Sequence, residues 1–443
     1  MEVLTKEELK AKIAAVVDDR AGDIKELAER IFRQPELGYK EFHTSQLVQE
    51  KFAELGLPFR KGLAITGVKA RLEGRGPGPG VAILGELDAV VCPGHPQADP
   101  MTGAAHSCGH HGQVAAMYGA ALGLSLSGAA GFLSGTVLFM AVPAEEYVEI
   151  EYRQKLRQEG KIRFLGGKQE LLALGEFDDV DMAMMVHQGA LAEGRKAMVG
   201  GTSNGFVGKL VRYRGREAHA GAAPHAGVNA LNAAMLGLMG VHMLRETFRD
   251  EDSIRVHPII TKGGDLVNVV PADVRAETYV RGRTMGAIIE ANRKVNRALV
   301  AGATAIGAEV EITELPGYLP RVSAGELDGL FRTNLLTLVA EEAVVEGGHG
   351  AGSSDMGDLM HVMPGIHPSI GGCRGRGHSE DFEVCDADLA YIVPAKALAM
   401  TAVDLLWDDA ATGRNLLAEF KPRYTRAEYF QMWEELLGRD GSR

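Results

Sequence analysis

The chain has few cysteines, no long run of basic residues and no apolar segment at its N-terminus. It contains four cysteines among 443 residues, too few for a disulfide scaffold in a chain of this size. Acidic residues outnumber basic ones by 59 to 47, giving a formal net charge of -12, so we expect no nucleic-acid partner. The first residues lack the apolar segment of a secretory leader, so we expect a cytoplasmic protein.

A membrane span is also not expected. Residues 113–144 carry no charge, but serines and glycines between 125 and 135 divide them into two shorter apolar pieces. The first piece predicts a helix and the second a strand. With 46% hydrophobic and 24% charged residues, the composition is that of an ordinary globular enzyme, which favours small-molecule substrates.

Three predicted buried strands each end in residues that can bind metals or move protons. They cover residues 81–88, 135–146 and 181–187, with helical stretches between them. This alternation predicts an α/β fold with a mixed, largely parallel sheet. In such sheets ligands bind beyond the carboxyl ends of the strands. The side chains that would emerge there are Asp88, Glu145, Glu146 and His187.

The pattern changes near Thr202. From there to residue 312 the predicted order of elements is β-α-β-β-α-β, which is typical of a small α+β open-faced sandwich. Helices and Gly/His-rich loops follow. The sequence therefore predicts a discontinuous catalytic domain, residues 1–201 and 313–443, with an inserted domain at 202–312.

The segment Cys108-Gly109-His110 is a candidate metal-binding turn. A thiolate and an imidazole separated by one glycine can face one ion, because glycine allows a tight bend and has no Cβ. Zinc and similar metals accept thiolate, imidazole and carboxylate ligands, and five ligands suit two ions that share one of them. The predicted set is Cys108, His110, Glu146, His187 and His378.

The adjacent carboxylates Glu145 and Glu146 can have different roles. One can bind a metal while the other takes a proton from a metal-bound water. Each residue taken singly also has a structural interpretation: Cys108 as a small core residue, the Glu pair as helix surface, and His187 as a hydrogen-bonded core histidine.

In these motifs the chain resembles the dinuclear-metal peptidases and amidohydrolases, a family that includes aminoacylases, glutamate carboxypeptidases, hippurate hydrolases and aminobenzoyl-glutamate hydrolases. The resemblance covers nearly the whole chain. Residues 352–358 and 361–368 look most like the dipeptidase branch, whose members cleave Xaa-Arg or β-alanyl-lysine dipeptides, with aminobenzoyl-glutamate hydrolases as near relatives. The matching motifs are Gly85–Ala89, Cys108–His110, Pro143–Glu146, His187, Ala218–Ala220, Asn268–Pro271 and Gly377–Ser379.

The resemblance implies a role for each site residue. Cys108 would bridge two divalent metals, and the other four predicted ligands would complete their coordination. Glu145 would be the general base, and Asp88 would orient a ligand. His219, on the inserted domain, would stabilise the oxyanion in a partner subunit's site, so the enzyme would be a homodimer through that domain.

Two further residues would bind substrate, and the chain departs from the family pattern at three places. Asn268 would lie in the substrate region of the inserted domain, and Arg281 would hold a substrate carboxylate. His111 replaces an Asp or Asn of relatives and would be an extra ligand or a contact to one. Residues 147–166 form a charged insert, either a solvated helix or a substrate-gating cap. Ser354-Asp355 replaces the Glu-Asp of the hippurate-hydrolase branch.

The sequence thus predicts a cytoplasmic, homodimeric, metal-dependent amidohydrolase acting on a dipeptide or an N-acyl amino acid. An N-acyl-amino-acid or aminobenzoyl-glutamate hydrolase is the nearest alternative. A non-catalytic binding protein of the same fold and a monomeric enzyme with a self-contained site are others. Zinc or manganese is the expected metal, although the same ligands accept cobalt or nickel.

Overall fold

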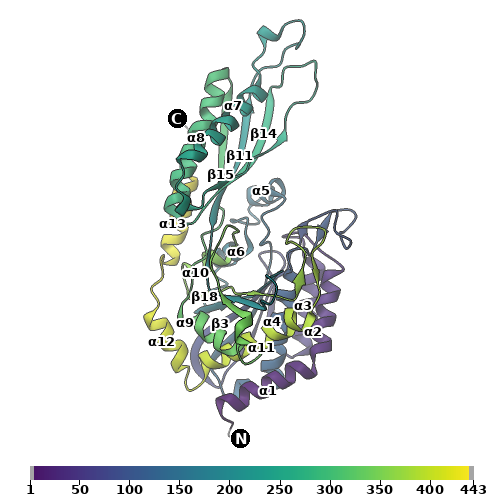
Figure 1. Ribbon diagram of the computed structural model, residues 1–443, viewed down its shortest axis with the longest axis vertical. Coiled ribbons are helices and arrows are strands. Elements are labelled where there is room, and N and C mark those ends of the chain that lie inside the picture. Colours follow the sequence, from purple (N-terminus) through teal and green to yellow (C-terminus); the bar gives the residue numbers. More distant parts are fainter. Residues whose placement is uncertain (1–3, 439–443) are drawn as a thin grey trace. The chain divides into compact units, whose positions relative to one another are not determined.

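The computed structural model describes residues 4–438 and divides them into two compact units (Figure 1). The first unit contains residues 4–201, 322–348 and 358–423. The second contains residues 202–321, 349–357 and 424–438. The second unit is therefore larger than the segment 202–312 expected from the sequence.

The first unit is built on a six-stranded mixed sheet. The strand order is β1-β2-β6-β3-β7-β18, in which β6, β3, β7 and β18 run parallel and β1 and β2 are antiparallel to their neighbours. The α/β fold with a largely parallel sheet is confirmed. The strands are β1 (Phe59–Leu63), β2 (Gly67–Glu73), β3 (Gly76–Glu86), β6 (Ser134–Val142), β7 (Met182–Met184) and β18 (Gly365–Ile366).

Helix α4 (His110–Leu126) packs against β3 and lies in the centre of the first unit. Its residues from His110 to Leu124 are all buried, as expected of a helix that is apolar on every side. The uncharged stretch 113–144 thus forms a core helix and then strand β6. The helices around α4 are α1 (Lys6–Asp19), α2 (Ala21–Phe32), α3 (Phe42–Glu54) and α11 (Val393–Leu406).

Within residues 4–438, one helical stretch, Asp388–Leu406, is long and apolar enough to cross a membrane. Within the protein 83% of its most apolar window is buried. It packs against α1 and α4, so its apolar composition is accounted for by the core of the first unit.

A second, four-stranded sheet in the same unit carries His187. The sequence predicts one strand over residues 181–187, but the strand breaks after Met184. His187 begins β8 (His187–Gln188), which pairs with β19 (Ser369–Ile370) and not with a strand of the six-stranded sheet. The sheet order is β16-β9-β19-β8, completed by β9 (Ala197–Val199) and β16 (Val344–Glu346).

The second unit is an antiparallel sheet with helices packed against it. Burial alternates strictly along β14 (Asp273–Gly282), as in a sheet with one covered face. The predicted α+β open-faced sandwich is confirmed. Its other elements are β11 (Gly205–Arg214), β12 (Arg255–Val256), β13 (Ile259–Lys262), β15 (Glu309–Leu315), α7 (Ala230–Met243) and α8 (Met285–Ile306).

Hydrogen bonds explain why the second unit extends beyond residue 312. The chain after β15 stays beside β11, where the Phe206 N–H donates to the Tyr318 carbonyl over 2.8 Å. Strand β17 (His349–Gly350) pairs with β10 (Thr202–Ser203), and α13 (Arg426–Leu437) packs near β15. These pairings join residues far apart in the sequence, which local patterns do not reveal.

Candidate metal centre

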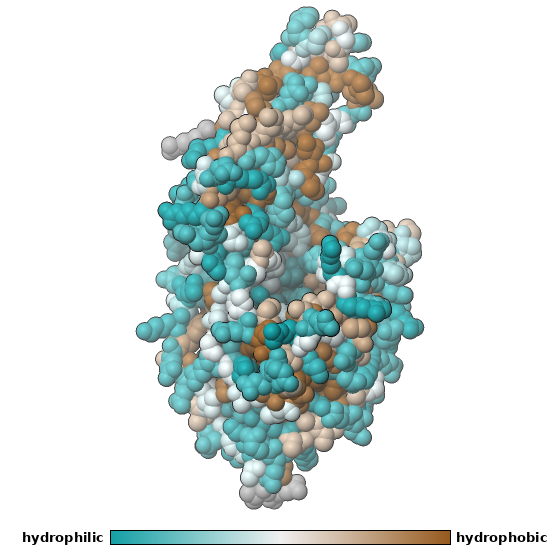
Figure 2. All heavy atoms as spheres, in the orientation of Figure 1, coloured by the Kyte–Doolittle hydropathy of each residue, from teal (hydrophilic) through white to brown (hydrophobic). Residues whose placement is uncertain are grey.

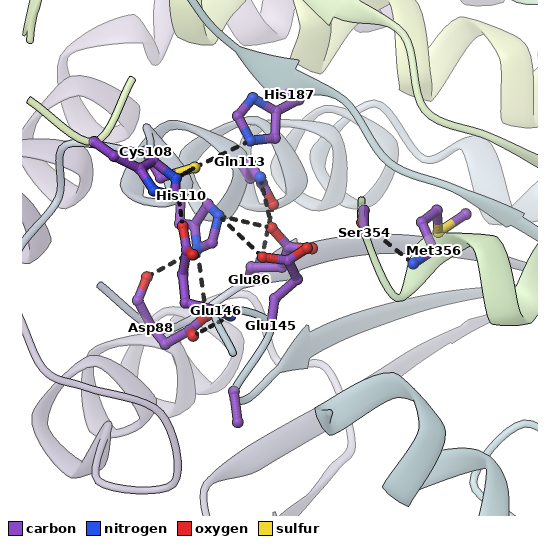
Figure 3. A network of polar contacts seen from close by, with 12 residues as sticks. Glu86, Asp88, Cys108, His110, Gln113, Glu145, Glu146, His187, Ser354 and Met356 are labelled. Carbon is purple, nitrogen blue, oxygen red and sulfur yellow. Dashed lines mark hydrogen bonds and ion pairs between the residues drawn. The ribbon is translucent and has the colours of Figure 1, made fainter. Parts of the chain in front are cut away.

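The turn before α4 brings Cys108 to His187, which comes from a distant segment (Figure 3), and to His378. Gly109 has φ 87, in the left-handed region that glycine adopts without strain, and α4 begins at the next residue. The Cys108 Sγ lies 3.4 Å from Nε2 of His187 and 3.3 Å from Nε2 of His378. The sharp turn thus directs a thiol from the helix start into a cluster of imidazoles.

The donor atoms form groups that could each hold a metal ion. Cys108, His110 and His187 form one group, and Cys108, Glu146 and His378 form a second, with all donor atoms of a group within 4.8 Å of one another. The two groups share Cys108. All five residues expected as ligands are therefore brought together, in an arrangement with one common ligand.

The charge state of Cys108 suits metal binding. Burial and the Glu146 carboxylate oppose ionisation, but the imidazoles of His110 and His187 outweigh them and lower the thiol pKa to about 6. The thiolate is the form that binds metals. The thiol is therefore largely ionised at neutral pH.

Glu146 and His378 complete the second group. Their Oε1 and Nε2 atoms lie 3.0 Å apart. Hydrogen bonds to Cys108 and Glu146 raise the pKa of His378 to about 11. Burial opposes ionisation of Glu146, but the hydrogen bond and charge of His378 outweigh it and lower the pKa to about 2. Charge pairing thus holds these side chains together.

Asp88 contacts two of the candidate ligands and belongs to none of the donor groups. Its carbonyl oxygen and Oδ1 lie 2.9 and 3.3 Å from Nδ1 of His110, and Oδ2 accepts the Glu146 N–H over 2.8 Å. Such contacts fix the ring that presents Nε2 to an ion. This is the geometry of a residue that orients ligands, the role expected for Asp88.

Glu145 lies next to this cluster. Its Oε2 is 3.9 Å from Nε2 of His110, and it belongs with Glu86 and His110 to a third donor group, which lacks Cys108. Only 8% of Glu145 is exposed. A buried carboxylate beside His110, a member of the first group, can reach a molecule bound there.

The sequence reasoning missed Glu86. Its Oε2 lies 3.0 Å from Nε2 of His110, and the fully buried Lys168 pairs with its other oxygen. Gln113 donates to Oε2 over 2.8 Å and accepts the Glu86 N–H over 3.1 Å. Glu86 is the last residue of β3 and stands two residues before Asp88, so the alternation of a strand that the sequence predicts over 81–88 would have placed both on one face. No comparable sequence pattern points to its partner, Lys168.

Replacing Lys168 by methionine should strongly destabilise the first unit. Removing one member of a buried ion pair leaves an uncompensated charge and costs about 3–5 kcal/mol. Urea unfolding measures the loss, with Arg33→Met as the control because its pair with Glu29 is exposed. A Lys168→Met protein as stable as the control variant would contradict this account.

His111 lies beside the cluster and belongs to none of the donor groups. Its Nε2 is 3.1 Å from the Tyr391 hydroxyl, and its ring packs against those of Phe32 and His106. Burial lowers its pKa to about 3, so the ring is neutral. These contacts pack His111 among other rings, and its expected role as an extra ligand or a contact to one stays a prediction.

Three predicted residues lie in the second unit. The exposed His219 accepts N–H bonds at Nδ1 from Gly221 and Ala222 over 3.1 and 3.0 Å. Asn268 lies on the neighbouring loop, and its carbonyl accepts the Ala220 N–H over 2.9 Å. Arg281 lies apart from this loop pair. It donates to the Ser353 hydroxyl over 2.9 Å, and its guanidinium is stacked on aromatic rings. The catalytic role of His219 and the substrate-binding roles of Asn268 and Arg281 stay predictions.

The charged insert 147–166 contains α5 (Ile150–Gln158) and is not simply a solvated helix. Ile150, Arg153 and Leu156 are buried on one side of it. A buried arginine in this helix was not foreseen, because its neighbours in the sequence are charged and typical of a surface.

Comparison with known proteins identifies the family. The model of peptidase family M20/M25/M40 matches residues 82–400. Xaa-Arg dipeptidase of Mus musculus is 30% identical over 426 residues, which cover 91% of this chain and 90% of that protein. A dinuclear metal binding peptidase of the M20 family from Bacillus subtilis has the same fold, with TM-score 0.63, 21% identity, and coverage of 87% and 98%.

The aminobenzoyl-glutamate utilization protein of Klebsiella pneumoniae also has this fold, with TM-score 0.68, 19% identity, and coverage of 89% and 98%. The family match covers more than half of the chain and includes the donor residues from Cys108 to His378. The expected enzyme class, a metal-dependent hydrolase of amide bonds, is confirmed. The chain belongs to peptidase family M20/M25/M40.

Proposed function

We propose that this enzyme is a dipeptidase that uses two metal ions and prefers dipeptides ending in a basic residue. The observation that carries the proposal is the pair of donor groups sharing Cys108, with the carboxylate of Glu145 beside them. The 30% identity with an Xaa-Arg dipeptidase over most of both chains supports the substrate class.

The residues of the cluster fit divalent metals. Thiolate, imidazole and carboxylate donors lie in two groups within 4.8 Å, and the low pKa of Cys108 favours the thiolate. Zinc or manganese is proposed, with cobalt and nickel compatible with the same donors. When bound, the ions would polarise the substrate carbonyl and lower the pKa of water.

The protein's own part in the reaction falls to Glu145. It lies outside both groups that share Cys108, and its Oε2 is 3.9 Å from Nε2 of His110. We propose that it accepts a proton from the attacking water and passes it to the leaving amine nitrogen. Asp88 holds the His110 ring and the Glu146 backbone, which keeps the donors in place while the proton moves.

A substrate panel tests the specificity. Metal-reconstituted protein is incubated with dipeptides ending in Lys, Arg, Glu or Leu and with acetyl-, benzoyl- and aminobenzoyl-amino acids, and products are identified by mass spectrometry. We expect cleavage of the Lys and Arg dipeptides at the highest rates. Faster cleavage of the acyl amino acids would assign the enzyme to the aminoacylase side, and no cleavage with metal bound would favour a binding protein.

We also propose a homodimer through the second unit. Support comes from apolar side chains at its surface, where Figure 2 shows hydrophobic patches. Met235, Met239 and Met243 recur every four residues along α7 and are 51%, 53% and 71% exposed, and the edge strand β13 exposes Ile259 and Ile260. Exposed apolar patches and unpaired strand edges are common at subunit interfaces.

Mixing two inactive variants tests whether active sites are shared. If His219 serves a partner subunit, His219→Ala and Glu145→Gln proteins should each be inactive but recover activity on subunit exchange. Up to about a quarter of wild-type activity is expected, because half of the dimers are mixed and half of their sites are intact. No recovery, with exchange verified by mass spectrometry of labelled chains, would favour self-contained sites.

A further inference from the structure

Arg153 is a fully buried cation in the charged insert, and neither the metal groups nor the proposed chemistry uses it. Helix α5 carries charged residues on its outer side, yet Arg153 is only 1% exposed. An arginine in such a place needs hydrogen-bond acceptors around its guanidinium. The groups that accept these hydrogen bonds indicate the role of Arg153.

The acceptors include the backbone carbonyls of the residues on either side of Glu145. Nη1 of Arg153 donates to the carbonyl of Ala144 over 3.3 Å and to that of Leu165 over 2.8 Å. Nη2 donates to the carbonyl of Glu146. One planar guanidinium therefore holds the peptide groups before and after the proposed general base.

The N–H groups of the same segment are also held. The Ala144 N–H donates to Oε1 of the buried Glu41, and the Glu146 N–H donates to Oδ2 of Asp88, each over 2.8 Å. Ala144 has φ 53, a left-handed conformation that non-glycine residues rarely adopt. A strained backbone keeps such a conformation only when its surroundings fix it.

Space for the guanidinium is provided by Gly38. A Cβ at this position would lie 2.2 Å from Nη2 of Arg153 and 2.9 Å from Cα of Ala144. The ring of Tyr39 lies 5.4 Å from the guanidinium carbon and forms another wall. The N-terminal segment and the insert thus enclose the arginine together.

We propose that Arg153 is a positioning residue that fixes the backbone carrying Glu145, so that its carboxylate faces the metal groups. The inference rests on the proposed function, in which Glu145 is the base. Lysine preserves the charge but lacks the planar fork, so it cannot hold the carbonyls of Ala144 and Glu146 in the same geometry. The insert then serves to organise the catalytic loop, a role different from a solvated helix or a substrate cap.

The first test is Arg153→Lys, with Arg157→Lys on the same helix as the control. In the metal-loaded Arg153 variant we expect kcat to fall about 10–100-fold with KM changed less than about twofold, since small misplacements of catalytic groups cost this much. Both metal ions should be retained. By hydrogen-exchange mass spectrometry, peptides covering residues 143–148 should exchange faster than in wild type, while those of α8 stay unchanged.

The second variant, Gly38→Ala, does not substitute Arg153 itself. Its added Cβ should displace the guanidinium and give the same loss of kcat and the same faster exchange. Unchanged exchange at 143–148 in both variants would overturn the proposal, as would loss of metal or of folding in parallel with kcat. Hydrogen exchange at residues 143–148 does not depend on the reaction. Whether Glu145 is the base is tested separately, by the activity of Glu145→Gln.

Discussion

Glu145→Gln should reduce turnover by at least about 10²–10⁴-fold while both metal ions stay bound. Glutamine has almost the same shape as glutamate but cannot accept a proton at neutral pH. The metal ions should remain, because Glu145 lies outside the two groups that share Cys108. Steady-state kinetics on the preferred dipeptide and metal analysis of the purified variant measure the two quantities.

The control for this variant is Glu151→Gln, which alters an exposed carboxylate on α5. It should behave as wild type. Retained turnover in Glu145→Gln would remove this residue from the mechanism. Loss of one ion from this variant would show that Glu145 is a metal ligand. That result would agree with its place in the third donor group, with Glu86 and His110.

Cys108→Ala should abolish activity and lower the affinity for both metal ions. A shared ligand belongs to both sites, whereas His187 and His378 each belong to one group. Loss of an outer contact to a ligand typically costs 10–100-fold in metal affinity, and we expect removal of this direct donor to cost more than about 100-fold. Titration against a competing chelator gives the affinities and the stoichiometry.

Cys385→Ser is the matched control for Cys108→Ala, since Cys385 is a free, exposed thiol outside the donor groups. His378→Ala provides the contrast, because it should weaken one ion more than the other. Equal effects of Cys108→Ala and His378→Ala on both ions would contradict the shared position of the thiol.

The sequence was informative where function is encoded by adjacent residues. Cys108 and His110 flank a glycine, and Glu145 and Glu146 follow a buried strand, so their chemistry could be predicted from spacing and from the rule that strand ends converge. The open-faced sandwich was likewise visible from its alternation of helices and strands. These signals depend only on short-range patterns.

The contacts that the sequence could not give join distant segments. Lys168 pairs with Glu86 across 82 positions, and Arg153 is buried because Gly38 leaves room for it. A lysine or arginine within charged neighbours has the pattern of a surface residue, and only the tertiary fold reveals the opposite. The expected cytoplasmic location and the role of His219 stay predictions.

The candidate ligands are spread along the chain from Cys108 to His378, and the whole second unit except its last segment is inserted between His187 and His378. The ribosome must therefore synthesise more than 180 residues after His187, the fourth candidate ligand, before it adds His378, the fifth. Only one of the two donor groups is complete until then. We expect nascent chains that end before His378 to hold one ion at most, so stalled chains of graded length would reveal the order in which the ions enter.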